Sequence, residues 1–324
     1  MCNTIVYASD NNYIPHLAAS ILSVIKTNTN ISDLNFYILD NAISKSEKDK
    51  LFEICNKYDR KIAFLDISKH IEEASLATSF NKTAFSRLFI ASIIKEEKAL
   101  YLDCDTIVNG SLQSLFETNL TGYLVAGVQD TVSSKLRMDV GLDYDEKYIN
   151  SGVLLINLKQ WREESIESKF IECIKSFNGD VPHNDQGIIN AVCHHRTLII
   201  DAKYNVQDAM QLYSGPQIEQ IFDIPKYYED TTLIDAKKRP VIIHYTEANF
   251  GRPWFIDSNH PFRREYLKYR EELKAYWPVP HEKTKLKKRI NRRAKQLIYK
   301  FFPFSLYKRI LFFKNTNHLF SKGK

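Results

Sequence analysis

The chain has 324 residues, 44 % of them hydrophobic, with 10 Gly and 10 Pro, so it is long enough to bury a large core and is close to the upper size of a single domain. Its formal net charge is +6, but residues 282–324 carry fourteen Lys or Arg and one acidic residue, which is +13, and this leaves −7 on residues 1–281. An acidic body argues against a nucleic-acid groove, and we expect no nucleic-acid partner, whereas the basic tail is expected to bind an anionic surface.

The first hundred residues are expected to alternate between strands and helices. Apolar runs predict strands at residues 4–8, 34–39, 61–65 and 100–102. Apolar residues at helical spacing predict helices at 14–27 and 83–94, and Ser44 with Glu47 has the pattern of a capping box that opens a further helix. This alternation is typical of an α/β fold with a mostly parallel sheet.

In the second half the same signals are less regular, which leaves an α+β elaboration open. Strands are expected at 123–128, 153–157, 198–200 and 241–244, and helices at 166–177, 186–193 and 262–277. Pro278 and Pro280 end the last of these helices and mark the end of the body. We therefore divide the chain into a body, expected to be one domain, at residues 1–280 and a basic tail at residues 281–324.

The tail is expected to form a basic amphipathic helix. Its apolar residues recur every three or four positions, at Leu286, Ile290, Ala294, Leu297, Ile298 and Phe301. Beyond Pro303, aromatic and aliphatic residues up to Phe313 form a second apolar cluster. Such a helix can lie in a membrane interface, where each basic residue near anionic lipid contributes about 1 kcal/mol to the free energy of membrane binding. The alternatives are packing of the apolar face on the body and binding of nucleic acid by the basic face.

The cysteines and the start of the chain bear on location. No CxxC pair occurs among Cys2, Cys55, Cys104, Cys173 and Cys193, which favours reduced thiols in the cytoplasm. The first residues lead directly into the apolar run at 4–8 that is expected to be a strand. No window of the sequence approaches 18 uninterrupted apolar residues. We therefore expect neither export nor a membrane span, and a cytoplasmic protein held peripherally at the membrane.

Two aspartates follow an apolar strand. Asp103 and Asp105 come directly after residues 100–102, and ligands of open α/β sheets bind outside the carboxyl ends of strands. Carboxylates at this spacing can converge on a divalent cation that neutralises a pyrophosphate. The alternatives are simple capping of the next element and the nucleophile motif of phosphatases, which lacks its Gly after Asp105 here.

Six ordered blocks of the sequence resemble glycosyltransferase family 8, the retaining bacterial galactosyl- and glucosyltransferases of lipopolysaccharide type, to which glycogenin is related. The blocks are residues 6–13 (VYASDNNY), 85–88 (FSRL), 101–105 (YLDCD), 149–158 (INSGVLLINL), 184–186 (NDQ), and 244–245 (HY) ahead of 252–254 (RPW). The resemblance implies a single Rossmann-like nucleotide-sugar-binding domain of the GT-A type, a UDP-galactose or UDP-glucose donor, and a saccharide or lipid-linked acceptor.

The resemblance implies that Asp103, Asp105 and His244 are the protein ligands of a divalent cation. A single His after a strand is more often structural, but two carboxylates with one imidazole favour Mn²⁺ over Mg²⁺, which stays open. Arg252 aligns with a family lysine that contacts the diphosphate, although it lies two residues further from His244 than in the relatives.

The resemblance also assigns donor contacts near the first strand and the acidic pair. Asp10 and Asn12 match positions that contact the uracil and ribose, and they otherwise have the pattern of an Asx-turn. Arg87 suits phosphate or sugar hydroxyls, although a lone helical Arg is more often part of a surface ion pair. Cys104 lies in the donor-binding block between the two aspartates.

Four further residues are implied to contact the donor sugar. Asn150 and Ser151 precede the strand expected at 153–157 and otherwise form a turn. Asp185 matches a position that binds sugar hydroxyls, and its alternative role is a helix cap. Gln186 is implied to lie beside the anomeric carbon, and these last two are the candidate catalytic residues. An amide is a poor nucleophile, so we expect attack on the same face of the sugar rather than double displacement.

Together these features predict a Mn²⁺-dependent retaining hexosyltransferase that contributes to a cell-surface glycan or lipopolysaccharide. The alternative is a catalytically silent relative that binds UDP-sugars or carbohydrates. The acceptor is expected to contact the stretch at residues 131–147. A chain ending at Pro280 is expected to stay soluble, to lose binding to anionic vesicles and to keep donor hydrolysis.

Overall fold

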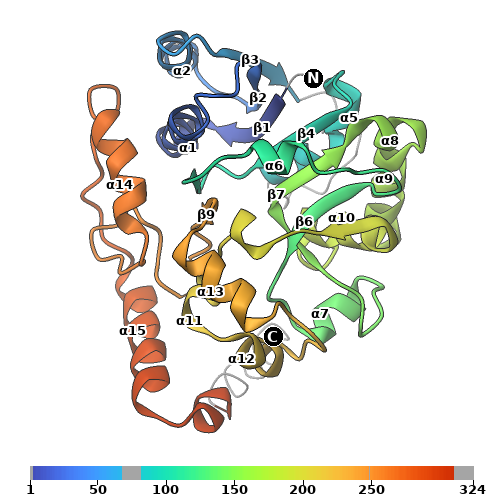
Figure 1. Ribbon diagram of the computed structural model, residues 1–324, viewed down its shortest axis with the longest axis vertical. Helices are drawn as coiled ribbons and strands as arrows, with labels where there is room; N and C mark the ends of the chain where they lie inside the picture. Colours follow the sequence, from blue (N-terminus) through green and yellow to red (C-terminus); the bar gives the residue numbers. More distant parts are fainter. Residues whose placement is uncertain (1–2, 68–81, 248, 310–324) are drawn as a thin grey trace.

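The computed structural model describes residues 3–67, 82–247 and 249–309. Its main sheet has seven strands in the order β3-β2-β1-β4-β7-β6-β8 (Figure 1). The strands are β1 (Asn3–Asp10), β2 (Leu34–Asn41), β3 (Lys61–Asp66), β4 (Lys98–Leu102), β6 (Val125–Gln129), β7 (Ile149–Asn157) and β8 (Thr197–Ile199). β7 runs antiparallel to both of its neighbours, and every other pair is parallel. The expected mostly parallel, mixed α/β sheet is confirmed.

The reversed strand decides which side chains meet at one edge of the sheet. The carboxyl ends of β1, β4 and β6 lie at this edge, and β7 begins there because it runs the other way. Asp10, Asp103 and Asp130 therefore follow or end three strands at the edge where Asn150 and Ser151 begin a fourth. The strand expected at 153–157 starts four residues earlier, so Asn150 and Ser151 lie within β7 and are not a turn.

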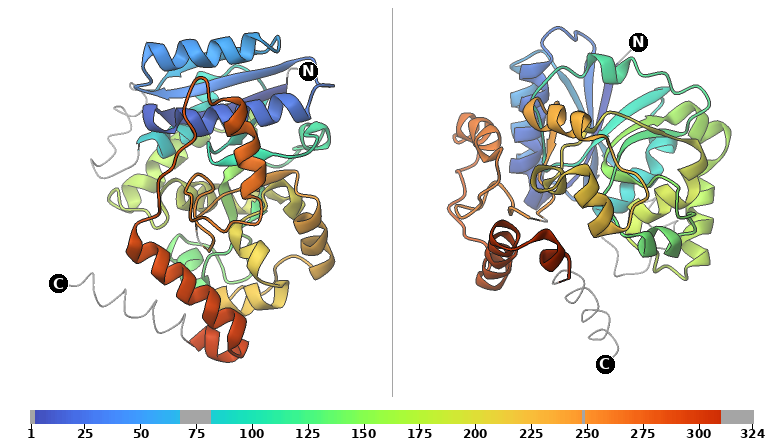
Figure 2. Two further views of the ribbon diagram at one scale, coloured as in Figure 1. Left: turned by 90° about the vertical axis from the view of Figure 1, so that its left-hand side faces the viewer. Right: turned by 60° about the horizontal axis from the view of Figure 1, so that its bottom comes forward.

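Helices cover both faces of the sheet. On one face, the core is built from alternate residues of β1, β4 and β7 with α1 (Ile14–Thr27), α2 (Lys45–Asn56), α6 (Gln113–Phe116), α11 (Asp208–Leu212), α12 (Gly215–Phe222), α13 (Asp230–Lys238) and α14 (Arg263–Glu272). The other face packs on α4 (Lys82–Phe85), α5 (Ile90–Ile93), α8 (Leu158–Glu163), α9 (Ile166–Ser176) and α10 (Asn184–Cys193). The two groups lie on opposite sides of the strands (Figures 1 and 2). Successive strand residues point to opposite faces, which explains the two cores.

Short elements connect these layers. They are η1 (Asn11–Tyr13), η2 (Ser86–Phe89), α7 (Ser134–Asp139), η3 (His194–Arg196) and η4 (Ala202–Tyr204). A second, two-stranded sheet pairs β5 (Thr106–Val108) with β9 (Ile242–His244) in antiparallel register, and it places Thr106 opposite His244. This pairing brings His244 to the acidic pair from far along the chain.

The helix expected at 83–94 is broken into α4, η2 and α5. Ser86 Oγ donates to the Thr83 carbonyl, and Arg87 Nε donates to the Ala84 carbonyl. Side-chain donors that bond to carbonyls three residues back compete with the regular helical bonds, which accounts for the 3-10 turn at this point.

The tail begins with the amphipathic helix α15 (Leu286–Phe301), which was expected, and residues 304–309 are also helical after the break at Pro303. Both α14 and α15 lie along one side of the body (Figure 2). The remainder of the second apolar cluster, including Phe313, lies outside the described residues. Within the described ranges, no helix combines the length and the apolar content that a bilayer span requires.

Candidate metal and donor site

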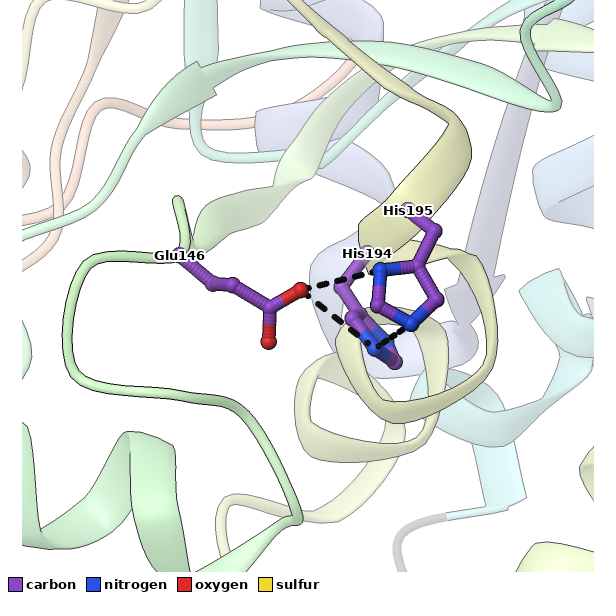
Figure 3. A group of neighbouring side chains, drawn as sticks. All are labelled: Glu146, His194 and His195. Atoms are coloured by element: carbon purple, nitrogen blue, oxygen red, sulfur yellow. Dashed lines mark hydrogen bonds and ion pairs between the residues drawn. The ribbon is translucent and has the colours of Figure 1, made fainter.

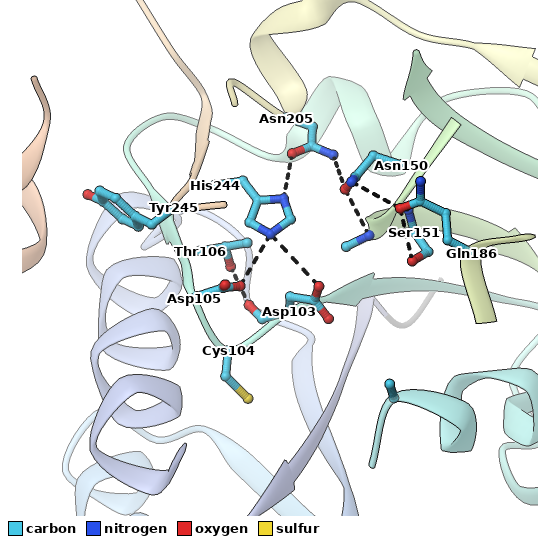
Figure 4. Close-up of polar contacts among 12 residues, drawn as sticks. Asp103, Cys104, Asp105, Thr106, Asn150, Ser151, Gln186, Asn205, His244 and Tyr245 are labelled. Atoms are coloured by element: carbon cyan, nitrogen blue, oxygen red, sulfur yellow. Dashed lines mark hydrogen bonds and ion pairs between the residues drawn. The ribbon is translucent and has the colours of Figure 1, made fainter. Parts of the chain in front are cut away.

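Asp103, Asp105 and His244 converge after β4 and at the end of β9 (Figure 4). His244 Nε2 lies 3.2 Å from Asp105 Oδ1 and 3.8 Å from Asp103 Oδ2. The three ligand atoms lie within 4.8 Å of one another. The three residues that the sequence analysis expected to be metal ligands therefore lie close enough together to hold one metal ion.

The hydrogen bonds of His244 fix which nitrogen faces the carboxylates. Its Nδ1 lies 3.0 Å from Asn205 Oδ1, and the amide nitrogen of Asn205 donates to Asn150 Oδ1 at 2.9 Å. An amide oxygen accepts, so Nδ1 carries the proton and Nε2 presents a lone pair. Burial lowers the pKa of His244, although Asp103 opposes this shift. A neutral imidazole directed at two carboxylates is suited to a divalent cation.

Gly152 leaves the space into which these side chains extend. A Cβ atom at this position would lie 2.3 Å from His244 Cε1 and 2.6 Å from Asp103 Oδ2. Both distances are far shorter than van der Waals contact. A side chain at position 152 is therefore incompatible with the observed positions of the imidazole and the carboxylate.

Arg87 joins the metal cluster, that is the side chains of Asp103, Asp105 and His244, to Asp185. Its guanidinium contacts Asp103 Oδ1 at 2.9 Å and Asp185 Oδ2 at 3.2 Å, and it donates to the Ser151 carbonyl at 2.7 Å. Tyr101 stacks below the guanidinium and donates to Asp103 Oδ1. Although burial disfavours its charged form, the two carboxylates raise the pKa of Arg87. Arg87 is 5 % exposed, so it is not the surface ion pair of the alternative interpretation.

A buried amide network continues from Ser151 to Gln186. Gln186 Oε1 accepts from Asn150 Nδ2 at 3.1 Å and from the Ser151 backbone at 3.0 Å, while Gln186 Nε2 donates to Asp130 Oδ2 at 2.7 Å. Ser151 Oγ donates to Asp185 Oδ2, and burial raises the pKa of Asp185. Asp185 is not the cap of α10, because that position belongs to His183. The four implied sugar-contacting residues thus form one connected group.

Arg252 reaches the metal cluster from a loop that follows β9. Its guanidinium pairs with Asp105 and donates to the Tyr245 carbonyl. Two residues further on, Trp254 stacks on His16 of α1 with ring centroids 3.9 Å apart. The two extra residues between His244 and Arg252 are thus accommodated in this loop, and Arg252 still reaches the acidic pair.

The side chains of Asp10 and Cys104, near the first strand, make hydrogen bonds to the main chain. Asp10 Oδ1 accepts from the backbone nitrogens of Asn12 and Tyr13, so the Asx-turn is present. The side chain of Cys104 points away from the carboxylates and donates to the Ala8 carbonyl (Figure 4). Burial raises the pKa of this thiol to about 12. Any donor contact of Cys104 must therefore come from its main chain.

Sequence reasoning missed Asp130 and Asn205. Asp130 follows β6 at the same sheet edge. Because ligands of open α/β sheets bind outside the carboxyl ends of strands, the position of Asp130 after a strand is a signal for a site residue, as it was for Asp103. Asn205 follows the short turn η4, and no pattern in the sequence relates it to His244. Its role depends on the meeting of distant segments.

The profile of glycosyl transferase family 8 matches residues 4–256. The chain belongs to this family. Among family 8 relatives, a putative glycosyltransferase of Haemophilus influenzae is 35 % identical over 214 residues, which is 62 % of each chain. The lipopolysaccharide 1,2-glucosyltransferase of Escherichia coli is 24 % identical over 275 residues, 82 % of this chain and 76 % of the relative.

The fold is also that of a solved galactosyltransferase structure. The crystal structure of galactosyltransferase LgtC in complex with donor and acceptor sugar analogues superposes with a TM-score of 0.70 and 22 % identity, and covers 83 % of this chain and 95 % of LgtC. This similarity confirms the GT-A architecture of the body. The identification of family 8 from the sequence is likewise confirmed.

Proposed function

We propose that this family 8 protein is a retaining glycosyltransferase that transfers a hexose from UDP-galactose or UDP-glucose to a saccharide or glycolipid acceptor, in the synthesis of a cell-surface glycan or lipopolysaccharide. The observation that carries the proposal is the convergence of Asp103, Asp105 and His244 beside a buried polar network. The lipopolysaccharide glucosyltransferase of E. coli and the galactosyltransferase LgtC, each named for the sugar it transfers, support a hexose donor.

Asp103, Asp105 and His244 are the proposed ligands of Mn²⁺, with Mg²⁺ as the alternative. The residues fit such an ion, because a neutral imidazole lone pair and two carboxylates face one another, with Gly152 leaving room for them. When bound, the cation neutralises charge on the departing diphosphate. Arg252 is proposed to move from Asp105 to the diphosphate, since its planar guanidinium suits phosphate oxygens.

We propose that the nucleotide and the sugar of the donor bind at different parts of the sheet edge where β1 and β4 end and β7 begins. Asp10 and Asn12 are proposed to contact the uracil and ribose, with the main chain of Cys104 beside them. Asp185, Asn150 and Ser151 are proposed to hold hydroxyls of the hexose, and the positive charge of Arg87 opposes the rise in the pKa of Asp185 that burial causes.

Gln186 is proposed to lie beside the anomeric carbon, with its side chain held by Asn150 and Asp130. The acceptor oxygen forms the new bond to that carbon on the face from which UDP departs with the electron pair of the broken bond. The acceptor proton passes to an oxygen of the departing diphosphate. Trapping of a glycosyl-enzyme adduct on a carboxylate would contradict this course of reaction.

The test is release of UDP from a panel of UDP-sugars, with Mn²⁺ and with chelator. We expect metal-dependent hydrolysis of one UDP-hexose and its loss in Asp103→Ala and Asp105→Ala. Gln186→Ala is expected to lower turnover more than donor affinity. A chain that binds UDP but releases it from no donor would be the silent relative.

The tail is proposed to hold the enzyme at an anionic membrane near lipid-linked acceptors. Leu286, Ile290, Leu297 and Phe301 fall within about 60° of one another around α15, and each is 56–68 % exposed. These four residues therefore form an apolar strip that the body does not cover, whereas Ile298 and Tyr299 of α15 and Tyr307 of the next segment pack on the body. Leu297→Asp is expected to weaken binding to anionic vesicles while it leaves the fold intact.

A further inference from the structure

A second group of potential metal ligands lies at the carboxyl end of α10. Glu146 comes from the segment between α7 and β7, whereas His194 and His195 begin η3, directly after α10 (Figure 3). The Nε2 atoms of the two histidines are 3.0 Å apart. Glu146 Oε1 lies 3.6 Å from His194 Nε2 and 3.0 Å from His195 Nδ1. These atoms lie within 4.8 Å of one another.

The partners of the outer nitrogen atoms determine the tautomers. His194 Nδ1 faces the carbonyl oxygens of Asn190 and Ala191 at 3.2 and 2.9 Å. Carbonyl oxygens only accept, so this nitrogen carries the proton. His195 Nδ1 faces the Glu146 carboxylate, which also accepts. In the neutral rings, both Nε2 atoms therefore present lone pairs to each other.

Two lone pairs facing each other at 3.0 Å repel, so this arrangement needs either a metal cation between or beside them or a proton on one of the rings. Two nitrogen ligands of a tetrahedral Zn²⁺ lie about 3.3 Å apart, which is close to the observed separation. The Glu146 carboxylate is held in place because its Oε2 accepts from the Asp143 backbone nitrogen at 2.8 Å. The carboxyl end of α10 adds partial negative charge.

We propose that Glu146, His194 and His195 form a second divalent-metal site, with the imidazole and carboxylate ligands that suit Zn²⁺. The ion would join the segment before β7 to the end of α10. Tyr148 of this segment also contacts His183 Nδ1, just before the start of α10, at 2.9 Å. The metal at one end of α10 and the Tyr148–His183 contact at the other would together hold α10 against the stretch expected to contact the acceptor. The site does not depend on the proposed sugar transfer.

The test is a Zn²⁺ titration of the full chain without a histidine tag, at neutral pH, by calorimetry. The proposed donor site also binds divalent ions, so we expect two equivalents for the wild type and one each for His195→Ala and Asp103→Ala. His195 is 78 % exposed on its side chain, and its replacement should leave the fold intact. His281→Ala, at an exposed position elsewhere, is the matched control and should bind two equivalents.

Glu146→Gln keeps an acceptor for the Asp143 nitrogen but removes the negative charge, so it should weaken Zn²⁺ binding about 10-fold or more. Unchanged stoichiometry and affinity in His195→Ala would overturn the proposal. So would a wild type that binds one equivalent which Asp103→Ala alone removes. In that case the two imidazoles and Glu146 form an ion pair that a proton bridges. One equivalent lost in His195→Ala alone would support this site and count against the proposed donor metal.

Discussion

The hydrogen bond from His244 to Asn205 illustrates how one uncharged residue prepares a metal ligand. Asn205 accepts from Nδ1 and thereby presents Nε2 to Asp103 and Asp105. Loss of such an outer partner typically lowers metal affinity 10- to 100-fold. We expect Asn205→Ala to weaken Mn²⁺ binding by about this factor in a calorimetric titration. Asn205→Asp keeps the acceptor and should retain most of the affinity; equal loss in both variants would contradict this role.

His16 gives a prediction for the pH dependence of stability. Burial, with Arg270 and Arg252, lowers the pKa of His16 to about 3, whereas an unfolded histidine titrates near 6.5. Between these values the unfolded chain binds the additional proton, so acidification destabilises the fold by up to about 1.4 kcal/mol per pH unit.

The variant His16→Gln removes this proton uptake. The free energy of unfolding of the wild type in urea, relative to that of His16→Gln, should therefore be roughly 2 kcal/mol lower at pH 5 than at pH 7.5. An equal difference at both pH values would show that His16 is not held neutral in the fold.

At the scale of the element, β7 approaches the metal cluster closely because Gly152 has no side chain. Gly152→Ala is expected to displace His244 or Asp103 and to abolish Mn²⁺ binding, with circular dichroism as the check on folding. Gly110→Ala is the control, since the nearest atom to its Cβ would be 3.4 Å away. Normal Mn²⁺ affinity in Gly152→Ala would contradict the positions of these ligands.

The helix α15 contacts the loop that carries Arg252. Arg292 pairs with Asp257 at 3.0 Å, and a Cβ at Gly251 would lie 2.1 Å from the Arg292 guanidinium. Lys288 contacts Glu247, and Gln296 donates to the Asn249 carbonyl. The polar side of α15 thus faces the loop, opposite its exposed apolar side.

This contact alters the expectation that the tail can be removed without effect on the donor. Arg292→Ala should raise the KM for UDP-sugar several-fold because the loop loses its support, and a chain ending at Pro280 should show at least this effect. Arg293→Ala removes an exposed neighbouring charge and serves as the control. Equal KM values for Arg292→Ala and wild type would separate α15 from the donor site.

For the molecule as a whole, the sequence predicted the elements best where local signals were strong. Apolar spacing placed α1 at Ile14–Thr27 as found, and the run after Lys98 placed Asp103 and Asp105 at a strand end. The capping box at Ser44 was half confirmed, because Ser44 accepts from the Glu47 nitrogen while the Glu47 carboxylate accepts from Trp277.

The parts that sequence reasoning missed depend on long-range pairing. The reversal of β7 cannot be inferred from its apolar run, yet it brings Asn150 and Ser151 to the site edge. Likewise, β5 is three residues long, and its pairing with β9 is what places His244 opposite Thr106. Family resemblance supplied His244 where local patterns alone did not.

The central claim is that Asp103, Asp105 and His244 hold one divalent ion that binds the diphosphate of a sugar nucleotide. Calorimetric titration of the full chain with UDP, in Mn²⁺ and then in chelator, tests it most directly. We predict binding in Mn²⁺ that falls at least 10-fold in chelator and in Asp105→Ala. UDP affinity that is the same in all three conditions would contradict the account.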